Sequence, residues 1–232
     1  FAVKMEEVLA QEAFNKSRES ETQMKEQLHR NEAMTSILKM LESENSFTKI
    51  VDDILKDACE YLGISAGALL RENQQKTVDM ICEYAGGGRE PQMAKEQGVP
   101  KEELPFFNGK PYMISSDSMM PEGFARLFAQ KKLTAAVFLP VEVNGHAGMY
   151  LCFCESEKKK KWENADVKFI NDVKRIIQTI LTKRITKNSL ASSYASLEAI
   201  LENVGCAIYV RDPQTGHILY ANEKYQKFFK KT

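Results

Sequence analysis

The apolar stretch 133–154 constrains the fold more than any other part of this sequence, because it has the pattern of two strands joined by a tight turn. Apolar residues recur at every second position over 133–143 and again over 147–153, which is the period of a strand with one face on a core. Asn144-Gly145 between these two runs is a strong hairpin signal. The opposite face is also apolar, so we expect a hairpin in mid-sheet with both faces covered.

The composition excludes several classes of protein. The 32 basic and 32 acidic side chains give zero net charge, so no global field attracts nucleic acid or acidic lipid. Five cysteines without a CxxC pair argue against a disulfide framework, and they indicate a reducing, cytoplasmic setting. We expect no membrane span, because no apolar run approaches the roughly 20 residues that a bilayer requires. The start at Phe1, with no signal peptide, is compatible with a piece of a longer protein.

Two long helices are predicted, one on each side of the central region. Residues 1–35 are polar and free of Gly and Pro, which favours a long exposed helix. A thin stripe at 4-3-4-3 spacing along 24–38 is typical of a coiled-coil seam with polar interruptions. The second helix follows Asn164 and runs past Ser189 with an apolar stripe. The residues expected at a helix contact in a homodimer are Met24, Leu28, Thr35, Leu38, Ile177, Ile180 and Leu181.

Between these helices the pattern predicts further elements. Residues 47–62 have the 3-4 spacing of a helix with a broad buried face, and Gly63 is placed to end it. Alternation over 64–70 and 77–84 predicts a second hairpin. The span 85–132 is irregular, with one predicted strand at 112–115 and one predicted helix at 121–130. Long loops inside compact domains are usually functional or mobile.

These segments, in this order, resemble a GAF domain over residues 36–187. The matching segments are ACEYLGIS, FFNGKPYMISSDS, LTAAVFLPVEVNGHAGMYLCF and KWENADVKFINDVKRIIQTIL. The resemblance implies an α+β fold, in which a GAF-like antiparallel sheet has helices on both faces and is flanked by long coiled-coil-type helices. A later segment, LEAILENVGCAIYVRDPQTGHILYANEKYQKFF, is similar to the first third of a PAS domain. The expected organisation is an N-terminal signalling helix (1–35), the GAF-like domain (36–187), a linker helix (188–203) and the start of a PAS-like domain (204–232).

The GAF resemblance implies a pocket roofed by the span 85–132. Aromatic side chains are available to line it, with one acid and one arginine as polar anchors. The alternative is that the same side chains fill the core. The candidate pocket residues are Tyr84, Phe106, Tyr112, Asp117, Phe124, Arg126, Phe128, Phe138 and Tyr150.

No motif indicates a cofactor, and its identity stays unknown. Cyclic-nucleotide GAF domains carry an Asn-Lys, a later Phe and an Asp-Glu, and here Asn108-Gly109-Lys110 is the nearest approach. No cysteine stands in a Cys-His setting like the bilin attachment site of phytochrome GAF domains. The three histidines lack ligand spacing, so no metal site is expected.

The resemblance implies a sensory or regulatory module rather than an enzyme. We expect it to bind a small ligand or to relay a conformational signal through dimeric helices. The recipient would be an output domain outside this sequence: a kinase, a diguanylate cyclase or phosphodiesterase, or a transcription activator. One alternative is a ligand-free dimerisation spacer. Another is a GAF-type methionine sulfoxide reductase that uses Cys152 and Cys154, although catalytic thiols require a polar environment that depresses their pKa.

Overall fold

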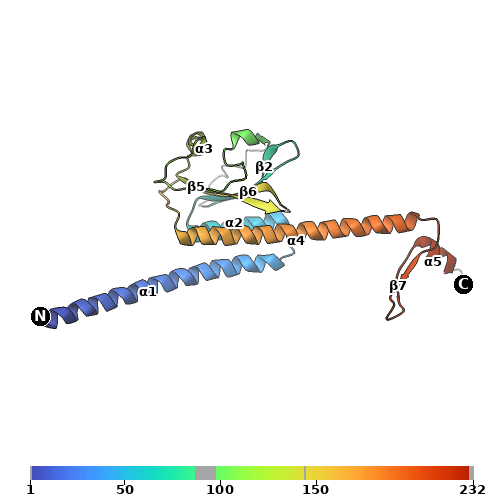
Figure 1. Cartoon of the computed structure of the whole chain (residues 1–232), viewed down its shortest axis with the longest axis horizontal. Coiled ribbons are helices and arrows are strands. Elements are labelled where there is room, and N and C mark those ends of the chain that lie inside the picture. Colours follow the sequence, from blue (N-terminus) through green and yellow to red (C-terminus); the bar gives the residue numbers. More distant parts are fainter. Residues whose placement is uncertain (1, 87–97, 144, 230–232) are drawn as a thin grey trace. The chain divides into compact units, whose positions relative to one another are not determined.

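A computed structural model describes residues 2–86, 98–143 and 145–229 of the chain (Figure 1). The chain divides into two compact units, 1–181 and 182–232. The elements of the first unit are α1 (Ala2–Lys39), α2 (Phe47–Leu62), β1 (Ala66–Glu72), β2 (Thr77–Ala85), β3 (Val99–Pro100), β4 (Tyr112–Ile114), α3 (Phe124–Lys131), β5 (Ala135–Val143) and β6 (His146–Glu155). Helix α4 (Asn164–Asn203) begins in the first unit and ends in the second, which also holds β7 (Tyr209–Arg211), β8 (Ile218–Ala221) and α5 (Glu223–Phe229).

The first unit is built on a six-stranded sheet with the order β3-β2-β1-β6-β5-β4. Each neighbouring pair is antiparallel. The predicted hairpin is confirmed as β5 and β6, which pair in register with Leu139 opposite Leu151. Gly145 takes the left-handed φ of 79° that such a turn needs, and Asn144 lies outside the described residues. The second predicted hairpin is β1 and β2, with a register shift between Leu69 and Leu70.

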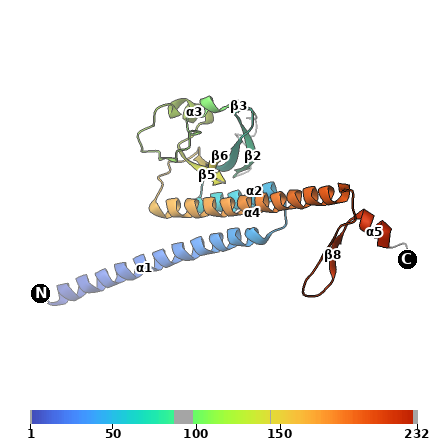
Figure 2. The same ribbon diagram turned by 45° about the vertical axis from the view of Figure 1, so that its right-hand side comes forward.

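Helices cover one face of this sheet, which we call the helix side. Both views place α2 and the beginning of α4 along this face (Figures 1 and 2). Their apolar side chains, such as Ile54 of α2 and Ile177 of α4, pack with Leu139 and Leu151 of the sheet in one buried cluster. Each fully buried aliphatic side chain contributes about 1.5–3 kcal/mol relative to an exposed one. A Cβ on Gly67 would lie 2.9 Å from the Cys59 sulfur, so α2 approaches β1 closely.

The ends of α2 explain its length. The Ser46 hydroxyl accepts a hydrogen bond from the Lys49 amide at 3.3 Å, which satisfies one of the unpaired donors of the first turn. Gly63 takes a left-handed φ of 59°, and its amide bonds back to the Glu60 carbonyl at 3.2 Å. The predicted glycine terminus is therefore confirmed.

Helix α1 is fixed to the helix side through its C-terminal third. The Arg30 guanidinium donates to the Asp172 carboxylate of α4 at 2.7 Å, and the Ser36 hydroxyl donates to Asp57 of α2 at 2.6 Å. Tyr61 packs its ring 4.1 Å from the ring of Phe169, and so joins α2 to α4 beside this ion pair. The long helix predicted over 1–35 is thus α1, and it contacts both neighbouring helices of the unit.

The segment 98–133 and helix α3 cover the opposite face, which we call the ring side. The predicted strand is confirmed as β4, and residues 87–97 of the predicted loop lie outside the described residues. Helix α3 begins at Phe124, three residues later than predicted, because Gly123 takes a left-handed φ of 84° and turns the chain just before it. The helices therefore lie on both faces, and the predicted fold class is confirmed.

Trp162 closes the sheet edge next to β4. Its indole N–H donates to the Ile114 carbonyl at 3.1 Å, and its backbone amide donates to the Ser115 hydroxyl at 3.2 Å. The Lys160 ammonium lies 5.3 Å from the centre of the indole ring. Paired in this way, the outer edge of β4 presents fewer free backbone groups to another strand.

The second unit is a small hairpin with a short helix. Asn222 is fully buried, and its side chain donates to the carbonyls of Leu201 and Cys206 at 3.1 and 3.0 Å. The same side chain accepts from the Tyr225 amide at 3.0 Å, so Asn222 caps α5. The Tyr220 hydroxyl donates to the Glu202 carboxylate at 2.8 Å. These bonds hold the hairpin to the end of α4 within this unit.

Candidate functional site

The ring side contains a cluster of aromatic side chains at the position where a pocket was predicted. The Phe106 ring lies 4.1 Å from the Phe138 ring with an angle of 9° between their planes, so the two are stacked. Phe124 lies 5.9 Å from Phe138, and Tyr112 lies 4.7 Å from Phe124. Such ring pairs add about 0.5–1.5 kcal/mol each beyond the area that they bury. The cluster is therefore a cohesive core and not an open hollow.

Two rings of this cluster, Phe106 and Phe107, come from a loop. Phe106 and Phe107 lie between the short 3-10 turn at Lys101–Glu103 and β4, and both are buried. The Phe107 ring is 4.5 Å from the Tyr150 ring of β6, and the Phe106 ring is 5.6 Å from it. The loop thus inserts two side chains against the middle of the sheet.

The Tyr150 hydroxyl ties the same loop to the sheet. It accepts a hydrogen bond from the Gly109 amide at 2.6 Å and donates to the Lys110 carbonyl at 3.4 Å. Burial raises the pKa of Tyr150, and the amide donor opposes that rise, so the phenol stays protonated near neutral pH. Asn108 closes the turn by donating to the Pro105 carbonyl at 3.0 Å and to the Tyr112 hydroxyl at 2.7 Å.

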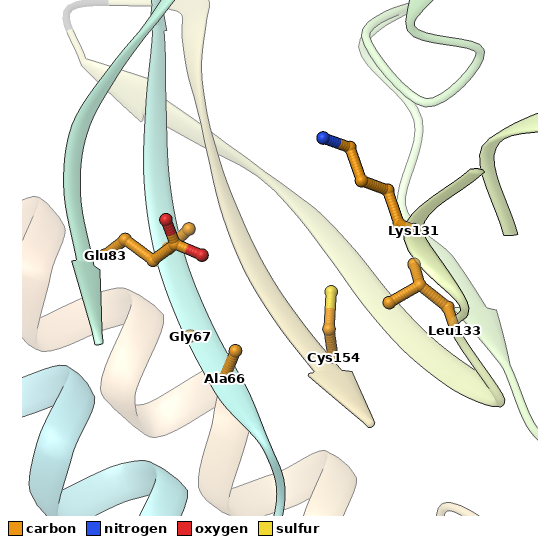
Figure 3. Close-up of a pocket in the computed structure, with 7 residues that line it drawn as sticks. Ala66, Gly67, Glu83, Lys131, Leu133 and Cys154 are labelled. Carbon is orange, nitrogen blue, oxygen red and sulfur yellow. The ribbon is translucent and has the colours of Figure 1, made fainter. Parts of the chain in front are cut away.

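A small cavity adjoins the cluster, with a volume of about 20 Å³. Figure 3 shows Glu83 of β2 on one side of it and Lys131 of α3 with Leu133 on the other, with Cys154 of β6 between the two sides. A cavity of this volume holds about one water molecule. The space in Figure 3 is therefore far smaller than a tetrapyrrole or a nucleotide requires.

The structure brings together six of the nine predicted pocket residues and separates the other three. Tyr84 lies on the helix side, with its hydroxyl 3.5 Å from the Glu60 carboxylate. Asp117 is exposed, 3.9 Å from the Lys161 ammonium, and Arg126 is exposed on α3 beside a cleft of about 390 Å³. The six that pack together are Phe106, Tyr112, Phe124, Phe128, Phe138 and Tyr150.

The thiols of the first unit are buried. Cys152 and Cys154 lie on the ring side of β6, and burial raises the pKa of Cys154 to about 12 and that of Cys152 well above its usual value. Burial likewise raises the pKa of Cys82 to about 12. At neutral pH these groups are thiols, which are poor nucleophiles and poor metal ligands. Within the described ranges, no group of three or more His, Cys, Asp or Glu side chains is placed to hold a metal ion.

The predicted dimer residues fall into two environments. Met24, Leu28, Thr35 and Leu38 are exposed on α1. In contrast, the three residues predicted on α4 are buried in the helix-side cluster and pack within their own chain: Ile177, Ile180 and Leu181.

Exposed apolar residues do occur on α4, but further along the helix, at Leu190, Tyr194 and Leu197, where the sequence has the 4-3 spacing of a seam. Sequence reasoning missed the loop contacts of Phe107 and Asn108. These contacts had no local signal, because they depend on which strand lies opposite.

Solved GAF domains share this architecture. A phycoerythrobilin-bound GAF domain from a cyanobacterial phytochrome is similar with a TM-score of 0.57 at 8% identity, covering 70% of this chain and 99% of that chain. GAF3 from Slr1393 of Synechocystis sp. PCC6803, in its photoproduct state, gives 0.53 at 12% identity and covers 62% of this chain and 99% of that chain. The PixJ GAF domain of Thermosynechococcus elongatus, in its blue-light absorbing form, gives 0.52 at 11% identity, with coverage of 64% and 93%.

In the comparisons of sequence, no family model matches the chain, and no curated protein matches it. At such low identities, structural similarity defines the fold alone. The chain therefore contains a GAF fold, to which a second, smaller unit is attached. Among the described residues, no helix has the length and apolarity needed to cross a membrane.

Proposed function

We propose that this chain is a sensory or regulatory relay module of a cytoplasmic signalling protein. It acts as a homodimer and passes a conformational change from α1, through the GAF fold, to α4 and an output domain beyond it. The observation that carries the proposal is the convergence of the two flanking helices. Helix α1 and the beginning of α4 lie on the same side of the sheet, joined directly by the Arg30–Asp172 ion pair. A movement of α1 therefore acts on α4 without crossing the sheet.

The exposed seams support a second copy of the chain as the partner. On α1, Met24 and Leu28 are 69% and 58% exposed. On α4, Leu190, Tyr194 and Leu197 are 55–65% exposed and follow the 4-3 spacing of a coiled coil. Burying each of these side chains contributes about 1.5–3 kcal/mol, so several per seam offset part of the cost of association. Isolated helices of this kind are only marginally stable, and pairing stabilises them.

The polar positions of the α1 seam suit a relay. Asn31 and Thr35 interrupt the apolar positions and are exposed. Polar residues at seam positions lower the stability of one packing and specify its register. Two helix packings of similar free energy are what a relay requires, since a small shift then selects between them.

The second unit supports a continuation into a PAS-like domain. Its hairpin and α5 expose several large apolar side chains, which a domain core would cover: Tyr209, Ile218, Leu219, Phe228 and Phe229. We therefore propose the organisation 1–35, 36–187, 188–203 and 204–232 for the signalling helix, GAF-like domain, linker helix and PAS-like start.

A bilin, as bound in several of the similar GAF domains, does not fit the residues of this chain. The cysteines of the first unit are all buried, and the ring side is packed with its own side chains. Cys206, the exposed cysteine, belongs to the second unit. No chemistry in the proposal depends on a bilin.

The reductase alternative is also disfavoured by the geometry. A catalytic thiol requires a depressed pKa and access to substrate. Cys152 is fully buried and Cys154 is 6% exposed, and burial raises the pKa of both. Methionine sulfoxide turnover that is lost in Cys152→Ser or Cys154→Ser would revive this alternative.

Light scattering of the whole chain tests the relay proposal. We expect a dimer at micromolar concentration, and we expect Leu190→Glu with Leu197→Glu to shift it toward monomer by at least tenfold in the dissociation constant, because two charges per chain enter the seam. Ser192→Glu is the matched control, since it adds one charge to the same turn of the helix away from the apolar stripe. A wild-type chain that is monomeric at high micromolar concentration would refute the dimer.

A further inference from the structure

We infer that this GAF fold carries its own internal occupant: the Phe106 ring, inserted by the loop 104–110, fills the ring side in place of a small molecule. The inference deepens the proposed function and rests on it, because a relay module filled in this way receives its input through its helices. It concerns the ligand of the module and not the dimer, so the two proposals can fail separately.

The position of Phe106 is the first support. Its side chain comes from a loop and not from a helix or strand, yet it is 0% exposed. It lies nearly parallel to Phe138 of β5, with ring centres 4.1 Å apart, and meets Tyr150 of β6 edge-on at 5.6 Å. A loop-borne ring between two sheet residues has the contacts that a planar apolar ligand would make.

A set of hydrogen bonds holds this loop closed. The Gly109 amide donates to the Tyr150 hydroxyl at 2.6 Å, so a buried side chain of β6 is hydrogen-bonded to the loop backbone. Asn108 adds bonds to Pro105 and to the Tyr112 hydroxyl, and its own side-chain oxygen accepts from the Lys110 amide at 3.0 Å. These bonds tie the turn after Phe106 to strands β6 and β4. The ring is therefore held in place by more than its own packing.

The space left beside the cluster is the third support. The adjoining cavity has a volume of about 20 Å³, which suits a water molecule and no aromatic ring. Its lining includes the charged side chains of Glu83 and Lys131 and the apolar side chain of Leu133 (Figure 3), and Phe106 does not line it. A separate surface cleft of about 390 Å³ is lined by α3 and residues 99–105, including the exposed Glu102 and Arg126. A ring-sized ligand at the centre of the cluster, against Phe138 and Tyr150, thus requires Phe106 to leave.

Truncating the occupant tests the inference. Phe106→Ala should lower the thermal midpoint by roughly 10 °C, because it removes a fully buried ring. Apolar cavities of this kind bind benzene, so saturating benzene should raise the midpoint of the variant by about 3 °C while leaving the wild type unchanged. Phe14→Ala, at an exposed ring of α1, is the matched control and should show neither effect. Benzene stabilisation equal in wild type and variant would overturn the inference.

Biliverdin is the second probe, applied to the wild-type chain. We expect no shift in midpoint and no change in its visible absorption. A midpoint shift of several degrees, or a change in the visible absorption of biliverdin with the wild-type chain, would show that the ring side opens to a tetrapyrrole while Phe106 is present and would overturn the inference.

If Phe106→Ala does not fold, Tyr150→Phe gives an independent reading, because it keeps the ring and removes the hydroxyl. Hydrogen exchange at the Gly109 amide should become about tenfold faster, as expected when a hydrogen bond of average strength is lost. Exchange at the wild-type rate would refute the role of the Tyr150 hydroxyl in holding the loop closed over Phe106. Light scattering of the same variant reports the dimer separately, so failure here leaves the relay proposal standing.

Discussion

The two sides of the sheet are built in different ways. On the helix side, regular helices with 3-4 spacing supply mostly aliphatic side chains, and two of these helices extend beyond the sheet. On the ring side, an irregular segment supplies aromatic side chains, and both of its ends return to the sheet. Strand β5 faces both, because its residues alternate between the two clusters.

This difference separates two roles within one small domain. A helix that packs at one end and is exposed at the other can carry displacement outward. A loop whose ends are both anchored encloses what lies beneath it. In this chain the outward-leading elements meet at Arg30 and Asp172, whereas the enclosed side is filled by Phe106 and its neighbours. Changes on the helix side should therefore reach α1 and α4 directly, whereas changes on the ring side should act first on the loop 104–110 and the strands beneath it.

The largest effect is expected from Phe169→Ala on the helix side. Phe169 is 0% exposed and packs its ring 4.1 Å from Tyr61, so truncation leaves a cavity where α2 and α4 meet. We expect a loss of about 3–5 kcal/mol in the free energy of unfolding, measured by urea denaturation. Phe14→Ala, at an exposed ring of α1, should change it by less than about 0.5 kcal/mol. A loss below about 1 kcal/mol for Phe169→Ala would contradict the close packing of this ring between α2 and α4.

A smaller effect is expected at Glu155, where β6 leaves the sheet. Its buried carboxylate accepts from the Ser65 hydroxyl at 2.6 Å and from the Ser156 and Glu157 amides at 2.9 and 2.8 Å. Glu155→Gln should cost about 1–3 kcal/mol, because the amide is a weaker acceptor for these donors. Urea denaturation at pH 7 measures this loss.

The same residue predicts a dependence on acid. Burial raises the pKa of Glu155, but the hydrogen bonds that its carboxylate accepts together lower the pKa by more than burial raises it. The pKa in the folded state therefore lies below the usual 4.5. The contribution is then fully present above the unfolded pKa and is lost as the pH falls through the folded pKa. Between pH 6 and about pH 3 the wild type should lose stability more steeply than Glu155→Gln. Parallel curves for the two proteins would contradict this assignment.

The smallest effect on stability is expected at Arg30→Ala. The Arg30 and Asp172 side chains are 27% and 32% exposed, so solvent screens the pair, and its loss should cost about 0.2–1 kcal/mol. The change should instead be visible as faster hydrogen exchange along the last turns of α1. Lys25→Ala removes an exposed ion pair with Glu21 within α1 and is the matched control. Equal hydrogen-exchange rates along the last turns of α1 in the two variants would contradict a direct coupling of α1 to α4 through this ion pair.

Much of the fold was predictable because its signals are local. The period of two over 133–143, the turn at Gly145 and the glycine that ends α2 each follow from a few consecutive residues. Strand β3 was not predicted, because two residues, Val99 and Pro100, give no measurable period. The start of α3 was misplaced, since Pro121 suits a first turn but Gly123 redirects the chain after it.

The candidate sites were less predictable, because they depend on what lies opposite a residue. A 3-4 stripe shows that one face of a helix is covered, but it does not tell whether its own sheet or a second chain covers it. For that reason Ile177, Ile180 and Leu181 were placed at a dimer contact, although they pack inside the unit. In the same way, aromatic residues near a predicted pocket are identical in sequence whether they surround a ligand or replace one.

Trp162 offers a practical consequence of the way the edge of β4 is closed. It is the one tryptophan of the chain, it belongs to the buried cluster of the helix side, and its indole N–H bonds to Ile114 of the ring side. The intrinsic fluorescence of the unaltered protein therefore arises from a single known position. Its emission colour and its quenching by added acrylamide would report, without any label, whether the two sides stay joined while the helices move.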